Sequence, residues 1–205
     1  MLSSYTLRLP KISDSLTKEL LDAALTYNFS GDGVPNPIIF NGVQQVDLDT
    51  AKNYHAITKQ TQAIYKIFPI PDELNNAIKN EMGDTLFPFK QTHLYYQRIE
   101  GGETISPHRD AVRKSHILYN ISNDGASTHF HNKLITDETR FAFNVHEISP
   151  PVETYVLEPY QWYLFNSQKI HSVTNITQTR VAVCVDMQFP YEKLYSYYKD
   201  KLIFD

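Results

Sequence analysis

The sequence predicts a mainly β fold with flanking α-helices, built around a jelly roll of two packed sheets. From residue 92 onward the apolar residues recur with a period of two, whereas before it they recur with a period close to 3.6. Turn residues divide this second part into short segments, as in the eight antiparallel strands of a double-sheet jelly roll. The predicted strands cover residues 92–99, 115–121, 127–131, 141–147, 154–157, 162–166, 171–175 and 180–188.

The first part of the chain is expected to brace the outside of these sheets. Leucines and alanines at helical spacing follow a cap at Ser13 or Asp14. Pro71 suits the first turn of another helix, which Gly83 is expected to end. The predicted order is a strand, a helix, a glycine- and proline-rich loop and two further helices, over residues 4–9, 14–27, 30–41, 49–67 and 71–83.

The composition predicts one domain with one substantial core. The chain has 205 residues, of which 41% are hydrophobic and 20% are charged, values that are ordinary for a globular domain. We expect a support region over residues 1–91 and a jelly-roll core over residues 92–189. Tyrosines and lysines at helical spacing predict a C-terminal helix over residues 190–205.

Charge and composition disfavour several classes of partner. The net charge is −4 and no long run of lysine or arginine occurs, so a nucleic-acid substrate is disfavoured. No stretch of about 18 apolar residues is present, which argues against a membrane span and a secretion signal. The single cysteine, Cys184, excludes an internal disulfide and is typical of a reducing, cytoplasmic setting.

The candidate functional site begins with the sequence His108-Arg109-Asp110. Side chains two residues apart on an extended chain point to the same face, so this imidazole and this carboxylate can bind one metal ion. The best candidate for a third ligand on a later strand is His171. Two imidazoles and one carboxylate on one side of a metal form the facial arrangement of non-haem Fe(II) oxygenases. Arg180, nine residues further on, could then bind a carboxylate of a metal-bound cosubstrate.

These motifs, in this order, resemble the Fe(II)- and 2-oxoglutarate-dependent oxygenases, and locally the prolyl and aspartyl/asparaginyl hydroxylases. The resemblance covers roughly the C-terminal half of the chain. The matching segments are residues 96–99, 101–102, 107–110, 117–121, 125–130, 164–175 and 180. It implies a double-stranded β-helix, the cupin-like form of the jelly roll. It also implies Fe(II) with 2-oxoglutarate and O₂ as cosubstrates, and ascorbate as a candidate reductant. The implied reaction hydroxylates an unactivated C–H bond of an amino acid, a peptide or protein side chain, or a related small molecule, and releases succinate and CO₂.

The resemblance also assigns roles to individual residues. His108, Asp110 and His171 are the expected metal ligands and the catalytic centre, and Arg180 is the expected anchor of 2-oxoglutarate. Further candidates for the 2-oxoglutarate pocket lie on the strands around the metal motif: Gln97, Asn120, Tyr95 and Val173. Substrate-facing candidates are polar residues near these strands: Arg113, His129 and His131.

Other functions are compatible with parts of the same pattern. His129 and His131 could form the HxH motif of a cupin, but that motif requires a glutamate a few residues later and flanking glycines. Here the next glutamate is Glu138, and Gly125 is the single glycine shortly before the motif. A non-catalytic jelly roll, cupin-like or an inactive oxygenase relative, would bind a metal or small ligand without turnover. A halogenase is disfavoured because Asp110 is present, where halogenases carry a small residue. The polar segments 30–43 and 132–140 are candidate lids.

Overall fold

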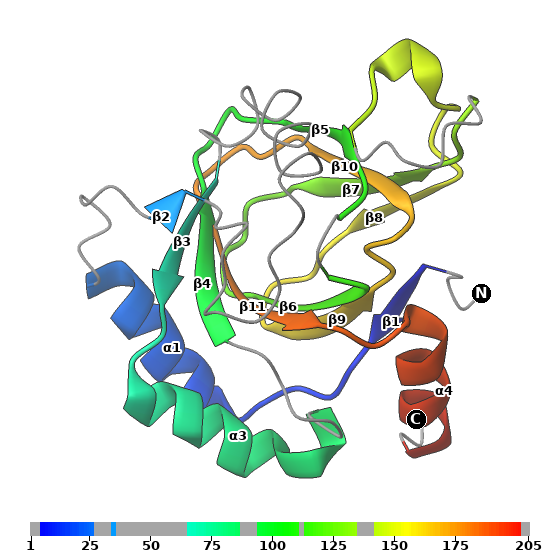
Figure 1. Cartoon of the computed structure of the whole chain (residues 1–205). Coiled ribbons are helices and arrows are strands. Elements are labelled where there is room, and N and C mark those ends of the chain that lie inside the picture. Colours follow the sequence, from blue (N-terminus) through cyan, green and yellow to red (C-terminus); the bar gives the residue numbers. More distant parts are fainter. Residues whose placement is uncertain are drawn as a thin grey trace.

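The computed structural model shown in Figure 1 describes residues 5–26, 34–35, 65–86, 94–110, 113–134 and 142–201. Its strands form two antiparallel sheets. The larger sheet contains β1 (Thr6–Arg8), β2 (Val34–Pro35), β3 (Tyr65–Pro69), β4 (Leu94–Ile99), β6 (Ser115–Asn120), β9 (Gln161–Phe165) and β11 (Arg180–Met187). The smaller sheet contains β5 (Ile105–His108), β7 (Ser127–His131), β8 (Glu153–Val156) and β10 (Ile170–Thr174). The helices are α1 (Asp14–Thr26), α3 (Asp72–Leu86), α4 (Tyr191–Lys201) and the short 3₁₀ helix η1 (Val145–Glu147).

The order of the strands in each sheet decides which residues become neighbours. The larger sheet has the order β1-β9-β6-β11-β4-β3-β2, and the smaller sheet has the order β5-β10-β7-β8. The two sheets lie opposite each other, and α1 and α3 cover the far side of the larger one (Figure 1). This arrangement confirms the prediction of a mainly β, double-sheet jelly roll with flanking helices.

The central strands of the larger sheet are buried on both faces. One face, which includes Ile117, Leu164 and Val183, packs against α1, α3 and α4 in the main hydrophobic core. The opposite face, which includes Leu118 and Cys184, packs toward the smaller sheet. Because both faces are covered, these strands are almost continuously apolar. A charged residue on the face toward the smaller sheet is therefore an exception to this pattern and a candidate functional residue.

The helices follow their predicted patterns, with one difference. In α1, Leu16, Leu20 and Ala24 are buried along one face. Helix α3 follows Pro71 as expected, but it does not end at Gly83. Gly83 adopts a positive φ of 45° that interrupts the helix, and a further helical turn continues to Leu86. A left-handed glycine is thus a kink within α3 and not its end.

Two predictions for the first part of the chain are wrong at the residues that the structure describes. Residues 65–67, expected as the end of a helix, belong to β3, and Val34–Pro35, expected in a loop, forms β2. Aromatic and β-branched residues favour extended chain at 65–68, and pairing with β4 provides hydrogen-bond partners. Residues 49–64 of that predicted helix lie outside the described residues. So do the predicted loop and lid at 30–43, apart from 34–35, and residues 135–140 of the second predicted lid.

The segment predicted as a strand over residues 141–147 contains η1 instead. The carboxylate of Glu147 accepts a hydrogen bond of 2.8 Å from the backbone N–H of Asn144. Such a local bond stabilises a helical turn against strand pairing. Among the described residues near the metal motif, β5 is the one strand that is missing from the predicted set. The sequence analysis treats this segment as extended chain without assigning a strand to it.

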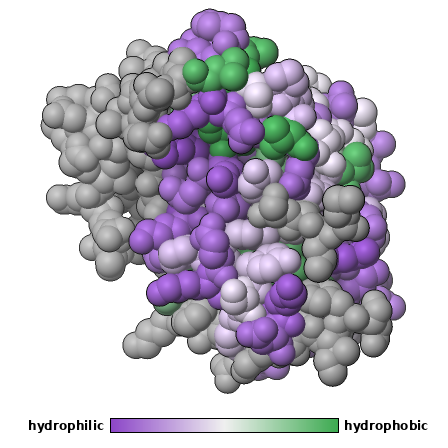
Figure 2. Space-filling model, turned by 90° about the vertical axis from the view of Figure 1, so that its right-hand side faces the viewer, coloured by the Kyte–Doolittle hydropathy of each residue, from purple (hydrophilic) through white to green (hydrophobic). Residues whose placement is uncertain are grey.

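The described surface is largely polar on the side shown in Figure 2, with small hydrophobic areas toward its top. Exposed large apolar side chains include Leu134, Val145, Val152 and Val156. Within the part of the chain that the structure describes, no helix has the length and apolar character needed to cross a membrane.

Candidate metal and cosubstrate site

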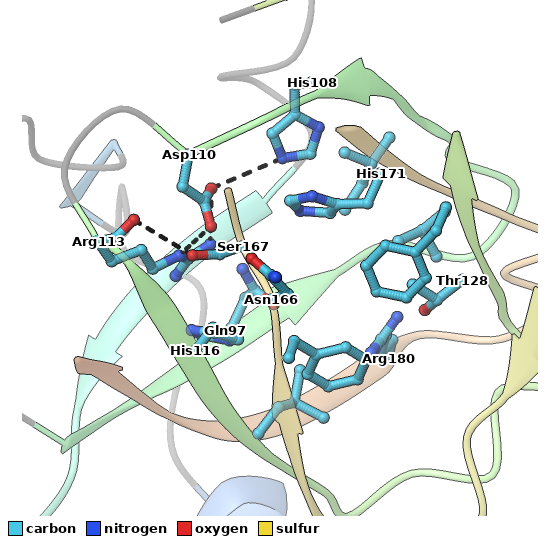
Figure 3. Close-up of a pocket in the computed structure, with 15 residues that line it drawn as sticks. Gln97, His108, Asp110, Arg113, His116, Thr128, Asn166, Ser167, His171 and Arg180 are labelled. Carbon is cyan, nitrogen blue, oxygen red and sulfur yellow. Dashed lines mark hydrogen bonds and ion pairs between the residues drawn. The ribbon is translucent and has the colours of Figure 1, made fainter. Parts of the chain in front are cut away.

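His108 and His171 come together because their strands are neighbours. His108 ends β5, His171 lies in β10, and the two residues are direct partners in the antiparallel pair. Directly opposite side chains in such a pair lie about 5 Å apart, and the two imidazole centroids are 4.3 Å apart. Asp110 follows β5, and one of its carboxylate oxygens, Oδ1, lies 3.8 Å from Nε2 of His108. One ligand atom from each residue lies within 4.8 Å of the others (Figure 3).

Both imidazoles are oriented by the backbone. Nδ1 of His108 lies 2.8 Å from the carbonyl oxygen of Ser106, and Nδ1 of His171 lies 2.8 Å from that of Lys169. A carbonyl oxygen accepts only, so each Nδ1 carries the proton and donates it. Nε2 of each neutral ring then keeps its lone pair, which is the form that binds a metal.

Burial keeps these two rings neutral. It lowers the pKa of His171 to about 3, with help from the neighbouring imidazole of His108. Burial also lowers the pKa of His108. At neutral pH both rings are therefore unprotonated and need not release a proton to bind a cation.

Asp110 is ionised although it is buried. Burial alone would raise its pKa, but the Arg113 guanidinium, followed by His171 and His108, outweighs this effect and holds the pKa at about 2. Two neutral imidazoles and one carboxylate form a donor set that suits a divalent transition metal with open positions. The residues present therefore fit Fe(II).

The loop between β9 and β10 holds Asp110 in place. The backbone N–H of Asp110 donates to the carbonyl of Ser167, at 2.9 Å. The side-chain amide of Gln168 donates to the carbonyls of Asp110 and Arg113, at 2.9 and 2.6 Å. Because the same loop leads into β10, it couples the position of Asp110 to that of His171.

Arg180 lies at the beginning of β11, with only 4% of its side chain exposed. Its Nε is 3.8 Å from Oδ2 of Asp124, too far for a hydrogen bond, and among the described residues Nε has no hydrogen-bond partner. Burial lowers the pKa of this guanidinium, and Asp124 opposes that effect. A buried guanidinium whose Nε donates no hydrogen bond suits an anionic ligand, which can accept one.

One cavity joins the metal-ligand cluster to Arg180. The space between its lining residues, including its opening to solvent, is about 580 Å³. Figure 3 shows His108, Asp110 and His171 at one end and Arg180 at the other. The cavity walls combine apolar and polar side chains: Gln97, Ile105, His108, Asp110, Arg113, His116, Leu118, Thr128, Phe130, Phe165, Asn166, Ser167, His171, Val173 and Arg180.

The remaining candidates for the 2-oxoglutarate pocket separate into two groups. Gln97 and Val173 line the cavity. Asn120 does not line it, and its amide oxygen accepts from Ser122. Tyr95 lies behind the wall, where its hydroxyl donates to Asp186 at 2.9 Å.

The substrate-facing candidates also lie in different places. Arg113 lines the cavity, but its guanidinium is bonded to Asp110 and Asp186. Phe130 and Thr128 of β7 line the cavity, so the alternating side chains of His129 and His131 point to the other face of the sheet. Their rings bond to hydroxyl and carbonyl groups there, of Thr154, Thr174, Ser172 and Ser149.

Several residues of the site are not among the sequence candidates. Asp124 and Asp186 accompany the two arginines, and Thr128 and His116 line the cavity. One signal in the sequence points to Asp186. It is a carboxylate in the apolar run of β11, at the same parity as the inward residues Ala182 and Cys184.

Comparison with solved structures finds the same fold at low sequence identity. A prolyl hydroxylase from Trichoplax adhaerens, in complex with a peptide fragment of the hypoxia inducible factor oxygen degradation domain, aligns with a TM-score of 0.50 and 13% identity. That alignment covers 95% of this chain and 87% of that chain. An oxidoreductase of the 2OG-Fe(II) oxygenase family from Burkholderia pseudomallei aligns with a TM-score of 0.41 and 12% identity, over 60% of this chain and 65% of that chain. This chain thus matches just under two thirds of the Burkholderia protein.

No family model and no curated protein matches the sequence. The similarity to known proteins is therefore structural, and the alignment with the Trichoplax enzyme spans nearly the whole chain. The chain has the double-sheet fold of a prolyl hydroxylase, which supports at the level of the fold the resemblance to the Fe(II)- and 2-oxoglutarate-dependent oxygenases.

Proposed function

We propose that this protein is an Fe(II)- and 2-oxoglutarate-dependent dioxygenase that hydroxylates an unactivated C–H bond. One observation carries the proposal: a single cavity contains three ligand atoms within 4.8 Å of one another and, at its other end, a buried arginine that can bind a carboxylate. An ion-binding barrel without turnover has no need of both groups.

Each part of the chain has a defined task in this proposal. His108, Asp110 and His171 would hold Fe(II) through Nε2, a carboxylate oxygen and Nε2. Arg180 binds the far carboxylate of 2-oxoglutarate with charge-assisted hydrogen bonds. Gln97, Thr128 and Val173 complete that part of the wall. When bound, Fe(II) and 2-oxoglutarate supply the oxidising chemistry from O₂, with ascorbate as a candidate reductant.

The apolar residues of the cavity exclude water from the reacting end. Phe130 and Phe165 line the cavity, and the ring centroid of Phe130 lies 6.1 Å from that of His171. Such a wall would strengthen an ion pair at Arg180 and keep solvent away from the metal ligands.

The proposed substrate is an amino acid, a peptide or protein side chain, or a related small molecule. A peptide is the first class to test, because the prolyl hydroxylase that shares this fold was solved with a peptide fragment. The cytoplasm is the proposed setting, since Cys184 is a free, buried thiol. The division of the chain into one domain with a helical support region also remains a prediction.

The experiment that tests the function is an anaerobic titration. Fe(II) and 2-oxoglutarate are added to the metal-free protein, and the weak visible charge-transfer band of their chelate is measured. Asp110→Ala should abolish iron binding. Arg180→Ala should retain iron but lose the band at the 2-oxoglutarate concentration that saturates the wild type. Asp22→Ala and Arg8→Ala, which change exposed ion-pair residues, are the matched controls.

The two alternatives give different results. A wild-type protein that binds iron without forming the band is a metal-binding jelly roll of another kind. A protein that binds no iron contradicts the proposed metal site altogether. If the band forms, release of succinate in the presence of peptide libraries identifies the substrate class.

A further inference from the structure

We infer that Arg113, held by Asp186, is a positioning residue that presents one oxygen of the Asp110 carboxylate to the metal. The inference rests on the proposed function, because it concerns how strongly the three-residue site binds its ion. It also gives Arg113 a role different from the substrate contact that the sequence indicates.

Arg113 donates hydrogen bonds to both carboxylate oxygens of Asp110. Its Nε donates to Oδ2 at 2.5 Å, and its Nη2 donates to Oδ1 at 3.2 Å. The shorter bond fixes Oδ2, while Oδ1 faces Nε2 of His108 at 3.8 Å. A fork of two bonds restricts rotation of the carboxylate, so Oδ1 is held toward the imidazoles before an ion arrives.

Asp186 fixes Arg113 from the other side. Its Oδ1 accepts hydrogen bonds from Nη1 of Arg113 at 2.7 Å and from the Tyr95 hydroxyl at 2.9 Å. Nδ1 of His116 lies 3.2 Å from the same oxygen. Tyr95, His116 and Asp186 belong to β4, β6 and β11, which are adjacent strands of the larger sheet. The guanidinium is therefore anchored to the centre of the larger sheet.

The arrangement also leaves a charge that suits a cation. One guanidinium lies between two carboxylates, those of Asp110 and Asp186, so this group of three carries a net charge of −1. The side chains are largely buried, with 16%, 9% and 22% exposed for Arg113, Asp110 and Asp186. A divalent ion compensates this negative charge, whereas an arginine paired with Asp110 alone would cancel it.

Arg113 has little capacity left for a substrate. Its Nε, Nη1 and Nη2 all donate to Asp110, Asp186 or the Tyr95 hydroxyl within the described chain. Burial alone would lower its pKa, but Asp110 and then Asp186 raise it, so the guanidinium stays charged. Its position in the cavity wall is thus that of a support for the ligand.

The test is the affinity of the metal-free, full-length protein for Mn(II), measured by the electron paramagnetic resonance signal of the free ion. Arg113→Lys keeps the charge and removes the planar fork, so its effect reports geometry. We expect Mn(II) to bind roughly 10- to 100-fold more weakly, as is typical when a ligand loses its supporting partner. Arg8→Lys, the same change in an exposed ion pair with Glu158, should leave the affinity unchanged.

A second variant keeps the test decisive if Arg113→Lys does not fold. Asp186→Asn retains the size of the side chain, removes one negative charge and loosens Arg113, and it should weaken Mn(II) binding several-fold. Because the positioning effect of Asp186 acts through Arg113, the loss of Mn(II) affinity in the double variant should be smaller than the sum of the two single losses, in free energy. At saturating Mn(II), the affinity of Arg113→Lys for 2-oxoglutarate should stay within about twofold of wild type, since Arg180 is unchanged.

Different binding results would contradict the positioning role of Arg113 and the proposed function of the protein. A wild-type protein that does not bind Mn(II) or Fe(II) contradicts the proposed function. A wild-type protein that binds Mn(II), together with Arg113→Lys and Asp186→Asn proteins of equal affinity, contradicts the positioning role alone. Lower thermal stability with unchanged affinity also contradicts the positioning role, because the network would then serve only the fold.

Discussion

The two ends of the cavity each contain an arginine–aspartate pair, and the pairs differ in geometry. At the metal end, Arg113 and Asp110 are joined by a fork with a bond of 2.5 Å. At the other end, Arg180 and Asp124 are 3.8 Å apart, without a hydrogen bond between Nε and the carboxylate. The tight pair restrains its carboxylate, and the loose pair leaves its guanidinium available. The same two residue types therefore prepare one end for a cation and the other for an anion.

The two ends of the cavity also differ in net charge. The metal end has a second carboxylate, Asp186, and carries −1 in total. At the Arg180 end one cation faces one anion. The Asp124 carboxylate also accepts from the backbone N–H of Ala126 at 2.7 Å and from the Ser122 hydroxyl at 2.8 Å. Asp124 is thus satisfied by its neighbours, whereas Arg180 is not.

The largest expected effect concerns the stability of the metal-free protein. It is measured with two single variants, each of which removes the carboxylate charge at one end of the cavity. Asp124→Asn leaves Arg180 buried without its counter-charge and should lower the free energy of unfolding by about 3 kcal/mol. Asp110→Asn should change it by less than about 1 kcal/mol, because Arg113 keeps Asp186 and the net charge of the metal end becomes zero. Urea denaturation followed by circular dichroism measures both values.

Equal losses from Asp124→Asn and Asp110→Asn would remove the distinction between the two ends. Arg180→Met in the Asp124→Asn background is the control for the mechanism. If the buried, unpaired guanidinium causes the loss, the double variant should recover part of it.

The pH dependence of stability should arise mainly at the metal end, where the histidines lie. The pKa of His171 is about 3 in the folded protein, against an ordinary value of 6.5. Between these values the unfolded chain binds a proton that the folded chain does not, so stability falls as the pH falls below 6.5. From pH 7.5 to 5.5, His171 alone should reduce the free energy of unfolding by about 1 kcal/mol.

The measurement compares metal-free wild type with His171→Asn over this pH range. The variant should show a distinctly shallower decline, and Val156→Thr, at an exposed strand position, should follow wild type. Parallel declines for wild type and His171→Asn would show that this imidazole is not held neutral by its site.

The sequence could indicate the metal-ligand cluster because its signals are local. The two-residue spacing of His108 and Asp110 and the order of the later motifs are visible without knowing which strands pair. The structure then brings His171 opposite His108 through the pairing of β5 with β10. That pairing joins segments 63 positions apart, which spacing alone does not reveal.

The residues that the sequence did not indicate depend on sheet order. Asp186 meets Arg113 and His116 because β11 lies between β4 and β6, and Asp124 meets Arg180 because their segments are adjacent in the fold. His129 and His131 show a related limit of predictions made from alternating side chains along a strand. A period of two shows that they share a face, but a shift of one residue decides which face looks into the cavity, and Phe130 occupies that position.

The smallest expected effect tests the wall beside Arg180. Figure 3 shows Thr128 on the Arg180 side of the cavity, away from His108 and Asp110. Thr128→Val preserves the shape of the side chain and removes one hydroxyl that can donate to a bound carboxylate. Loss of one such hydrogen bond, about 1 kcal/mol, should weaken 2-oxoglutarate binding by about fivefold. The affinity for Mn(II), measured on the same preparation, should not change, because the hydroxyl contacts no metal ligand in the described structure. An equal loss of Mn(II) and 2-oxoglutarate affinity would mean that the two ends do not act separately; a loss confined to 2-oxoglutarate would show that the anion end can be tuned independently of the metal end.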